Sequence, residues 1–336
     1  MKTIMQKRIK SKIYALFFWQ TNFGELLNKI YDLILFYSYS FKNKGLSDVE
    51  NLRACLIKEY HIVEKGMALP NPRAGFGNAK ILALIPKTEL YVERSGCEDT
   101  LVQSIKESMV EYLSLNQERG EDMTTPYYQT IRQFVSGSKM GILGGTKVMK
   151  KIEIEKSICI DYERFVSQRV SVRDFSSEAV KKEELSKAIN IAKNAPSVCN
   201  RQAWKAHVFL NDIDIAKLLT YQHGNAGFGE TLKALIVVTT DIKSFTNLES
   251  NQVFIDGGIF SMSLILALHS VGLGSCAMNT CIPYVDEKKI KLIGEIPSNE
   301  RLIMMLGVGQ LKEEFKVPIS YKKDDSQIVS FHQETH

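Results

Sequence analysis

The sequence lacks the usual marks of a metal centre and of a membrane-spanning protein. Its six cysteines are scattered without a CxxC pair, and neither Cys276 nor Cys281 has a histidine nearby, so we expect free thiols and no zinc site. The apolar run at 13–19 is shorter than the roughly 20 residues that span a bilayer. No small-residue cleavage site follows this run, so a signal peptide is not expected either. We therefore expect a cytoplasmic protein.

A basic field of the kind that nucleic-acid binders carry is also missing. The net charge is +5, and the first twelve positions alone supply five basic residues and no acidic one: Lys2, Lys7, Arg8, Lys10 and Lys12. The rest of the chain therefore sums to zero, and we expect no nucleic-acid partner. The basic start is either a solvated terminus or, with the apolar run behind it, a contact with anionic lipid through residues 2–19.

Repeats, low-complexity tracts and a GxGxxG fingerprint for a pyrophosphate cofactor are absent as well. What remains is an ordinary globular composition, with 44% hydrophobic and 24% charged residues. A length of 336 residues suggests two units, and a glycine-rich stretch between them marks the boundary. We expect a mainly helical region at 1–140, a linker at 141–160 and a second domain at 161–336.

The spacing of apolar side chains predicts helices in the first region. Three of them are expected at 25–37, 98–118 and 124–135. A further helix starts at the capping-box pair Ser47 and Glu50. The second domain alternates helices with strands, which indicates an α/β or α+β fold. Its helices are expected at 181–193 and 252–271, and its strands at 205–210, 234–240 and 302–308. The helix at 252–271 is apolar on most sides, so we expect it in the core or at an interface.

The first of three distinctive segments lies near the start of the second domain. Arg169, Ser171 and Arg173 alternate, so in an extended segment they point to one side. Two guanidinium groups and a hydroxyl on one side suit a phosphate. A surface strand whose arginines lie in water would show the same spacing.

Two further segments follow. The loop at 195–204 carries the amides of Asn200 and Gln202, which can donate and accept hydrogen bonds to the edge of a heterocycle. Gly272 and Gly274 come after the long apolar helix. They either let a ligand approach the backbone or simply end the helix.

Together these segments resemble the nitroreductase family of flavoproteins. The sequence reads R-x-S-x-R-x-F, then A-P-S-x-x-N-x-Q-x-W, then an apolar helix that ends in G-L-G, and the resemblance covers about 161–330. It implies an α+β fold, a nitroreductase-like sandwich preceded here by the mainly helical region. It also implies a homodimer with FMN at the interface, in which electrons pass from NAD(P)H through FMN to a small-molecule acceptor.

The resemblance implies specific FMN-binding residues. Arg169 and Ser171 match positions that hold the phosphate, and Arg173 matches a basic residue near the pyrimidine ring. The other matches are the loop around the ribityl chain and ring, the backbone that faces flavin N5, and a closing basic segment: Pro196, Ser197, Asn200, Gln202, Ala277, Met278, Asn279, Lys316 and Lys322. No catalytic acid or base is implied, because the flavin performs the chemistry.

Several positions depart from the family pattern. Val170, Ala203 and Lys322 stand where arginine or histidine, proline and arginine are common, and Asn279 stands where some members have glutamate. The sequence therefore does not predict which substrate the site accepts. Of the histidines, His207 and His269 are expected in the core, whereas His223 is a candidate for lining the open face of the flavin.

Two classes of function remain. The first is an FMN-dependent oxidoreductase, with a dehydrogenating or flavin-consuming enzyme as a variant on the same fold. The second is a non-enzymatic binding or scaffold protein that has kept the fold. The helical region loosely resembles that of nitroreductase-like proteins linked to surface-polysaccharide synthesis. We expect residues 1–140 to tune access or location without being needed for FMN binding, and the turn at 73–77 to cap the flavin face.

Overall fold

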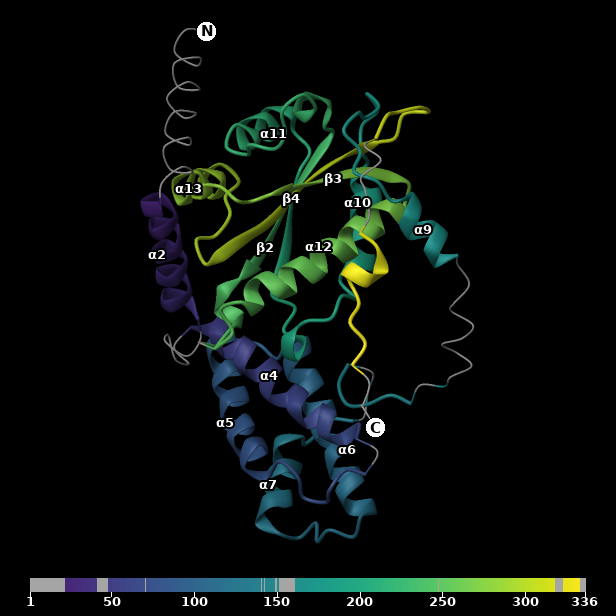
Figure 1. The fold of residues 1–336 in the computed structure, drawn as a ribbon. Helices are drawn as coiled ribbons and strands as arrows, with labels where there is room; N and C mark the ends of the chain where they lie inside the picture. Colours follow the sequence, from purple (N-terminus) through teal and green to yellow (C-terminus); the bar gives the residue numbers. More distant parts are fainter. Residues whose placement is uncertain are drawn as a thin grey trace.

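The computed structural model describes residues 22–40, 48–69, 71–139, 141, 143–148, 150, 161–246, 248–317 and 323–332. Within these ranges, helices come first and a domain with one β-sheet follows, so the fold is α+β (Figure 1). We call residues 49–135 the helical region and residues 161–317 the sheet domain.

The N-terminal part of the described chain is helical. Its helices are α2 (Asn22–Tyr39), α4 (Val49–Met67), α5 (Asn78–Ser95), α6 (Thr100–Glu118) and α7 (Pro126–Phe134). Helices α4 to α7 share one core, whose fully buried side chains include Leu56, Ile81, Ile105 and Tyr112. Periodic apolar residues thus produce the helices that the sequence predicts, and their buried faces meet.

Two details of these helices differ from the sequence prediction. The N-cap of α4 is Asp48, whose carboxylate accepts the N–H groups of Glu50 and Asn51 at 3.0 and 3.1 Å, so the helix begins one residue later than the predicted cap. Helix α5 was not predicted because Pro86 lies inside it, and proline normally ends a helical pattern.

The sheet is antiparallel, with strand order β1-β2-β4-β3. Its strands are β1 (Trp204–Phe209), β2 (Ala234–Asp241), β3 (Leu273–Asn279) and β4 (Glu300–Gln310). The three predicted strands are confirmed to within two residues at each end. Strand β3 was not predicted, because its small residues show no clear alternation of apolar and polar positions.

Helices cover both faces of the sheet. Ile236 and Val238 of β2 pack toward α10 (Lys182–Ala192) and α12 (Gln252–Ser270). Leu235 and Val237, which alternate with them, pack toward the other face. That face is covered by α11 (Asp212–Leu219) and α13 (Tyr284–Ile293). The continuous apolar run of β2 therefore reflects a strand that is buried on both sides.

Helix α12 is confirmed almost as predicted. It is long and apolar enough to cross a membrane by composition alone. Its buried residues Phe260, Leu264 and Leu268 belong to the core between α12 and the sheet. This packing accounts for the buried face of α12, whereas Phe254, Ile255, Ile259 and Met262 on the same helix are exposed.

The described part of the predicted linker is bound to the helical region. Glu107 accepts the N–H groups of Leu143 and Gly144 at 2.8 and 3.1 Å, and Glu64 accepts the N–H of Gly145 at 3.0 Å. Glu111 accepts the N–H of Thr146 at 2.6 Å. Carboxylates of α4 and α6 thus hold this glycine-rich segment, whereas residues 151–160 of the predicted linker lie outside the described residues.

Helix α2 attaches to the sheet domain. Asn28 accepts the N–H of Tyr284 at 2.9 Å, and Asp32 forms an ion pair with Arg301 at 3.0 Å. The hydroxyl of Tyr39 lies 2.7 Å from that of Ser298. Figure 1 shows α2 beside α13, apart from α5, α6 and α7.

Candidate functional site

The segment with the alternating arginines runs along β3. Ser171 pairs with Ser275 in a parallel bridge, and the N–H of Val172 donates to the Ser275 carbonyl at 2.9 Å. Val172 and Phe175 are buried in the sheet-domain core, which fixes the segment. Because side chains alternate, Ser171 and Arg173 lie on the side away from Val172.

Charge contacts also place Arg173 beside β3. Burial raises the pKa of the Cys276 thiol, and the positive charge of Arg173 acts on the same thiol in the opposite direction. Lys312, just after β4, pairs with Asp174 at 2.5 Å. Lys316 is exposed further along the same tail, and Lys322 lies outside the described residues.

The three residues at the end of β3 present alternating faces. Ala277 and Asn279 are exposed, whereas Met278 is buried in the core. The carbonyl of Asn279 accepts the side chain of Gln222 at 3.1 Å, which ties the loop around His223 to this strand end. His223 itself is exposed.

The backbone explains why glycine occupies positions 272 and 274. Gly272 has φ +85°, so it is the left-handed end of α12. A methyl group on Gly274 would lie 2.8 Å from Leu311 Cδ2 and 3.2 Å from Phe175 and Val172. Gly274 therefore lets the arginine-bearing segment pack tightly on β3.

The loop before β1 has an unusual backbone. Cys199, Asn200 and Gln202 have φ values of 50°, 52° and 50°, in the left-handed region that non-glycine residues rarely adopt. The Oγ of Ser197 accepts the N–H of Gln202 at 2.9 Å, and the Asp256 carboxylate accepts the N–H of Val198 at 3.1 Å. Such conformations cost about 1–3 kcal/mol each and persist at sites where the surroundings enforce them.

The predicted ligand side chains of this loop point outward. Pro196, Asn200 and Gln202 are exposed, and Ser197 is half-buried. The Gln202 amide nitrogen lies 3.3 Å from Asn200 Oδ1, so the two amides form one polar edge. The loop therefore presents hydrogen-bonding groups to solvent on a constrained backbone.

A buried arginine that the sequence reasoning missed holds this loop from behind. Arg201 is 4% exposed, and its guanidinium donates to the Val198 and Ser244 carbonyls at 3.1 and 2.6 Å and to Glu249 at 2.8 Å. Burial alone would raise the pKa of Glu249, but hydrogen bonds from Arg201 and the Thr246 N–H lower it. Arg201 therefore has a structural role. In the sequence it stands between the predicted ligands Asn200 and Gln202, and nothing in that position indicates a buried side chain.

The helical region supports the same loop. Asn51 of α4 is fully buried, and its amide donates to the carbonyls of Tyr39 and Lys243 at 3.1 and 2.9 Å. Lys243 also pairs with Asp48 at 2.9 Å. Ser244, whose carbonyl holds Arg201, is the next residue in the short helix η3 (Ile242–Ser244). A cavity of about 220 Å³ lies between α4 and the loop.

The turn at 73–77 lies elsewhere. The N–H of Gly75 donates to Asn116 Oδ1 at 2.7 Å, and the Tyr112 hydroxyl donates to the Phe76 carbonyl at 2.7 Å. Both partners belong to α6, so this turn packs within the helical region. In one chain it forms no lid over the predicted cofactor residues, because the packing of Phe76 against Gly66 and Tyr112 fixes it.

Two histidines have structural partners. His207 Nε2 lies 2.6 Å from Glu300, which also accepts hydrogen bonds from Thr239 and Lys205 at 2.5 and 3.0 Å. Burial raises the pKa of Glu300, but these three hydrogen bonds lower it to about 2. His269 Nε2 lies 3.1 Å from the Phe165 carbonyl.

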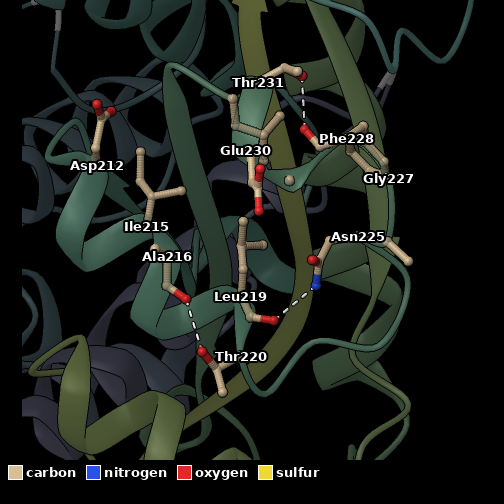
Figure 2. A pocket seen from close by; sticks show the side chains of 13 residues that line it. Asp212, Ile215, Ala216, Leu219, Thr220, Asn225, Gly227, Phe228, Glu230 and Thr231 are labelled. Carbon is tan, nitrogen blue, oxygen red and sulfur yellow. Dashed lines mark hydrogen bonds between the residues drawn. The ribbon is translucent and has the colours of Figure 1, made fainter. Parts of the chain in front are cut away.

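A larger cavity of about 610 Å³ lies between α11 and the loop at 225–232. Figure 2 shows Asp212, Thr220 and Glu230 among the side chains around it. The carboxylates of Asp212 and Glu230 line it without a basic side chain, so it does not suit a phosphate. The predicted cofactor residues do not line this cavity.

The predicted cofactor residues thus form two groups on one chain. One group, Arg169 to Arg173 with 275–279, lies along β3, and the other, 196–202, precedes β1. Strands β1 and β3 are the two edges of the sheet. Three strand spacings of roughly 4.8 Å each separate them by about 14 Å.

Comparison with known proteins assigns this domain. Residues 166–310 match the model of the nitroreductase family. These residues form a nitroreductase-family domain. The family supports an oxidoreductase function, and the residues before 166 lie outside the match.

Solved structures of nitroreductase-family proteins are similar to this domain. A nitroreductase family protein from Streptococcus pneumoniae is 22% identical over 51% of this chain and 100% of its own, with a TM-score of 0.44. An FMN-dependent nitroreductase from Clostridium difficile is 24% identical over 50% and 98%, with a TM-score of 0.43. A nitroreductase-like protein from Streptococcus mutans is 20% identical over 52% and 98%, with a TM-score of 0.45. No curated protein sequence matches the chain.

Proposed function

We propose that the protein is an FMN-dependent oxidoreductase that passes electrons from NADH or NADPH to a small-molecule acceptor. The observation that carries the proposal is the placement of Arg169, Ser171 and Arg173 on one rigid segment against β3. Within the family match over 166–310, this segment offers a hydroxyl and two guanidinium groups, which suit a phosphate and a flavin ring.

The residues on this segment fit a phosphate monoester. Arg169 follows α9 (Tyr162–Gln168) in an extended conformation and is half-buried. The Ser171 hydroxyl lies two residues on, in the same bridge to Ser275. Arginine and hydroxyl donors suit phosphate oxygens, and Lys316 of the tail adds a positive charge. Lys322 would be a further phosphate ligand.

The remaining side chains suit an isoalloxazine ring. Bound FMN would supply hydride and electron-transfer chemistry. The positive charge of Arg173 favours electron uptake by a group beside it. The exposed amides of Asn200 and Gln202 can orient a polar ring edge, with Pro196 and Ser197 on the same loop. The backbone of Ala277, Met278 and Asn279 forms the opposite wall.

The proposal includes a homodimer, because one chain does not bring both groups of residues together. The loop at 196–202 leads into β1, and β1 and β3 are opposite edges of the sheet, about 14 Å apart, so a second copy would complete the site. Helix α12 offers the interface, since it exposes the apolar side chains Phe254, Ile255, Ile259 and Met262 by 39% to 50%. Apolar stripes of this size on soluble proteins mark contact surfaces.

Purification of the full chain tests the proposal. The protein should be yellow, release FMN and not FAD on denaturation, and oxidise NADH or NADPH in the presence of an artificial acceptor. A colourless protein that cannot be reconstituted with FMN would favour the alternative, a binding or scaffold protein on the same fold. Release of FAD would contradict the phosphate site described above.

A further inference from the structure

Helix α2 carries an apolar face that is largely exposed in the described part of the chain. Its large side chains are between 41% and 67% exposed: Phe23, Leu26, Ile30, Leu33, Ile34 and Tyr37. Most of them follow one another at spacings of three and four residues, so they form one stripe along the helix. The stripe spans 15 residues, or about 21 Å.

The stripe points away from the sheet domain. Asn28, Asp32 and Phe36 contact Tyr284, Arg301 and the core around Val253. At 100° per residue, the centre of the stripe lies on the side of the helix opposite to these contacts. Helix α2 is therefore attached through Asn28, Asp32 and Phe36, and it presents its apolar stripe outward.

A surface of this kind indicates a partner. Single exposed apolar side chains are ordinary, but a contiguous group of this size marks a protein or membrane contact. The stripe itself contains no charged residue, and Glu25 and Lys29 are the charged side chains exposed next to it. The structure thus favours an apolar medium or an apolar partner surface.

Charge complementarity identifies the partner. The sequence just before α2 carries five basic residues and has no acidic residue until Glu25. Anionic lipid attracts such a segment by about 1 kcal/mol for each Lys or Arg near the surface. A second copy of the chain offers no net negative charge to this basic segment, because the rest of the chain sums to zero, whereas an anionic lipid surface does.

We propose that α2 docks the protein on the surface of anionic membranes, with its stripe inserted among the lipid headgroups and acyl chains. The basic residues at 2–12 supply the electrostatic attraction and the stripe supplies the apolar insertion. Peripheral membrane binding commonly needs two such signals. This inference does not depend on FMN binding or on the redox reaction.

Vesicle co-sedimentation of the full chain tests the proposal. The wild type should bind vesicles of phosphatidylcholine with phosphatidylglycerol, bind phosphatidylcholine alone weakly, and lose affinity as salt rises. The double variant Ile30→Asp with Leu33→Asp should bind anionic vesicles at least about tenfold more weakly, since each lost apolar insertion costs roughly that factor. The variant Lys7→Gln with Arg8→Gln should lose binding on anionic vesicles by a similar factor.

A matched control is Ile213→Asp, because Ile213 is 65% exposed on α11 and far in sequence from α2. It should bind vesicles as the wild type does. The proposal is overturned if the wild type does not bind anionic vesicles, or if the α2 double variant binds them as tightly as the wild type does. Loss of self-association by the double variant in light scattering, with vesicle binding unchanged, would show that a second copy covers the stripe. Unchanged circular dichroism verifies that each variant is folded.

Discussion

The side-chain amide of Asn51 donates a hydrogen bond to the backbone carbonyl of Lys243, 192 positions later in the chain. This contact joins α4 of the helical region to the short helix η3, which contains both Lys243 and Ser244. The Ser244 carbonyl in turn holds the guanidinium of Arg201 behind the proposed flavin loop. The helical region is therefore part of the support of the candidate site.

The first prediction tests this support. Asn51→Ala should lower the free energy of unfolding by roughly 1–3 kcal/mol, because the partly buried carbonyls of Tyr39 and Lys243 lose their donor. It should also weaken FMN binding by up to about tenfold, since the loop at 196–202 loses support. Asn116→Ala is the matched control: Asn116 is equally buried, but it bonds within the helical region. Equal FMN affinity of both variants would show that α4 does not influence the loop.

The second prediction concerns the phosphate. Arg169→Ala should weaken FMN binding by about ten- to a hundredfold, the cost of one lost charge-assisted hydrogen bond. The variant should keep the wild-type melting temperature of the apoprotein. Arg164→Ala, an exposed arginine on the same short helix, serves as the control. An unchanged FMN dissociation constant for Arg169→Ala would place that side chain outside the site.

The third prediction concerns the dimer. Ile259→Asp places a charge in the middle of the exposed stripe of α12, so the dimer should dissociate to monomers in light scattering. Flavin should be lost along with the dimer, because each chain holds the two groups of residues at opposite edges of its sheet. Leu292→Asp, at a position 80% exposed on α13, should leave both properties unchanged. A monomer that retains flavin would refute the shared site.

The fourth prediction follows from Glu300. Its folded-state pKa, lowered to about 2, lies below the ordinary value of a glutamate. The stabilisation is therefore complete above the ordinary pKa and is lost as the pH falls through the folded pKa. Glu300→Gln should reduce the free energy of unfolding at about pH 7, and its difference from the wild type should narrow as the pH falls from about 5 to about 2. Glu313→Gln, at an exposed site, should show no such trend, and a difference that is independent of pH for Glu300→Gln would contradict the argument.

The sequence could predict the elements with strong periodicity. Helix α12 and strand β2 matched expectation closely, because a 19-residue apolar helix and an eight-residue buried strand have few alternatives. Motif order located the family and the arginine-bearing segment. Helix α5 was not predicted because it contains Pro86. Strand β3, one edge of the sheet, was not predicted because its residues are small.

Tertiary contacts decided what the sequence could not. Asn51 has an ordinary position on an amphipathic helix, and only its partners far along the chain show that it supports the loop. Arg201 stands between two predicted ligands, yet it is buried. These contacts also favour a different role for residues 1–140 from the one that we expected from the sequence. Removing them would expose the back of the proposed flavin loop, so a truncated chain should hold FMN poorly.

The long separation between Asn51 and Lys243 also bears on how the protein is made. A ribosome that adds about 5–20 residues per second takes roughly 10–40 s to travel from one partner to the other. During that interval the nascent α4 has its helix but not the carbonyl that its buried amide requires. The face of α4 that later meets the sheet domain stays open to water and to chaperones until the second half of the chain emerges. Synonymous codon changes that alter this delay should change the yield of folded protein while leaving its sequence intact.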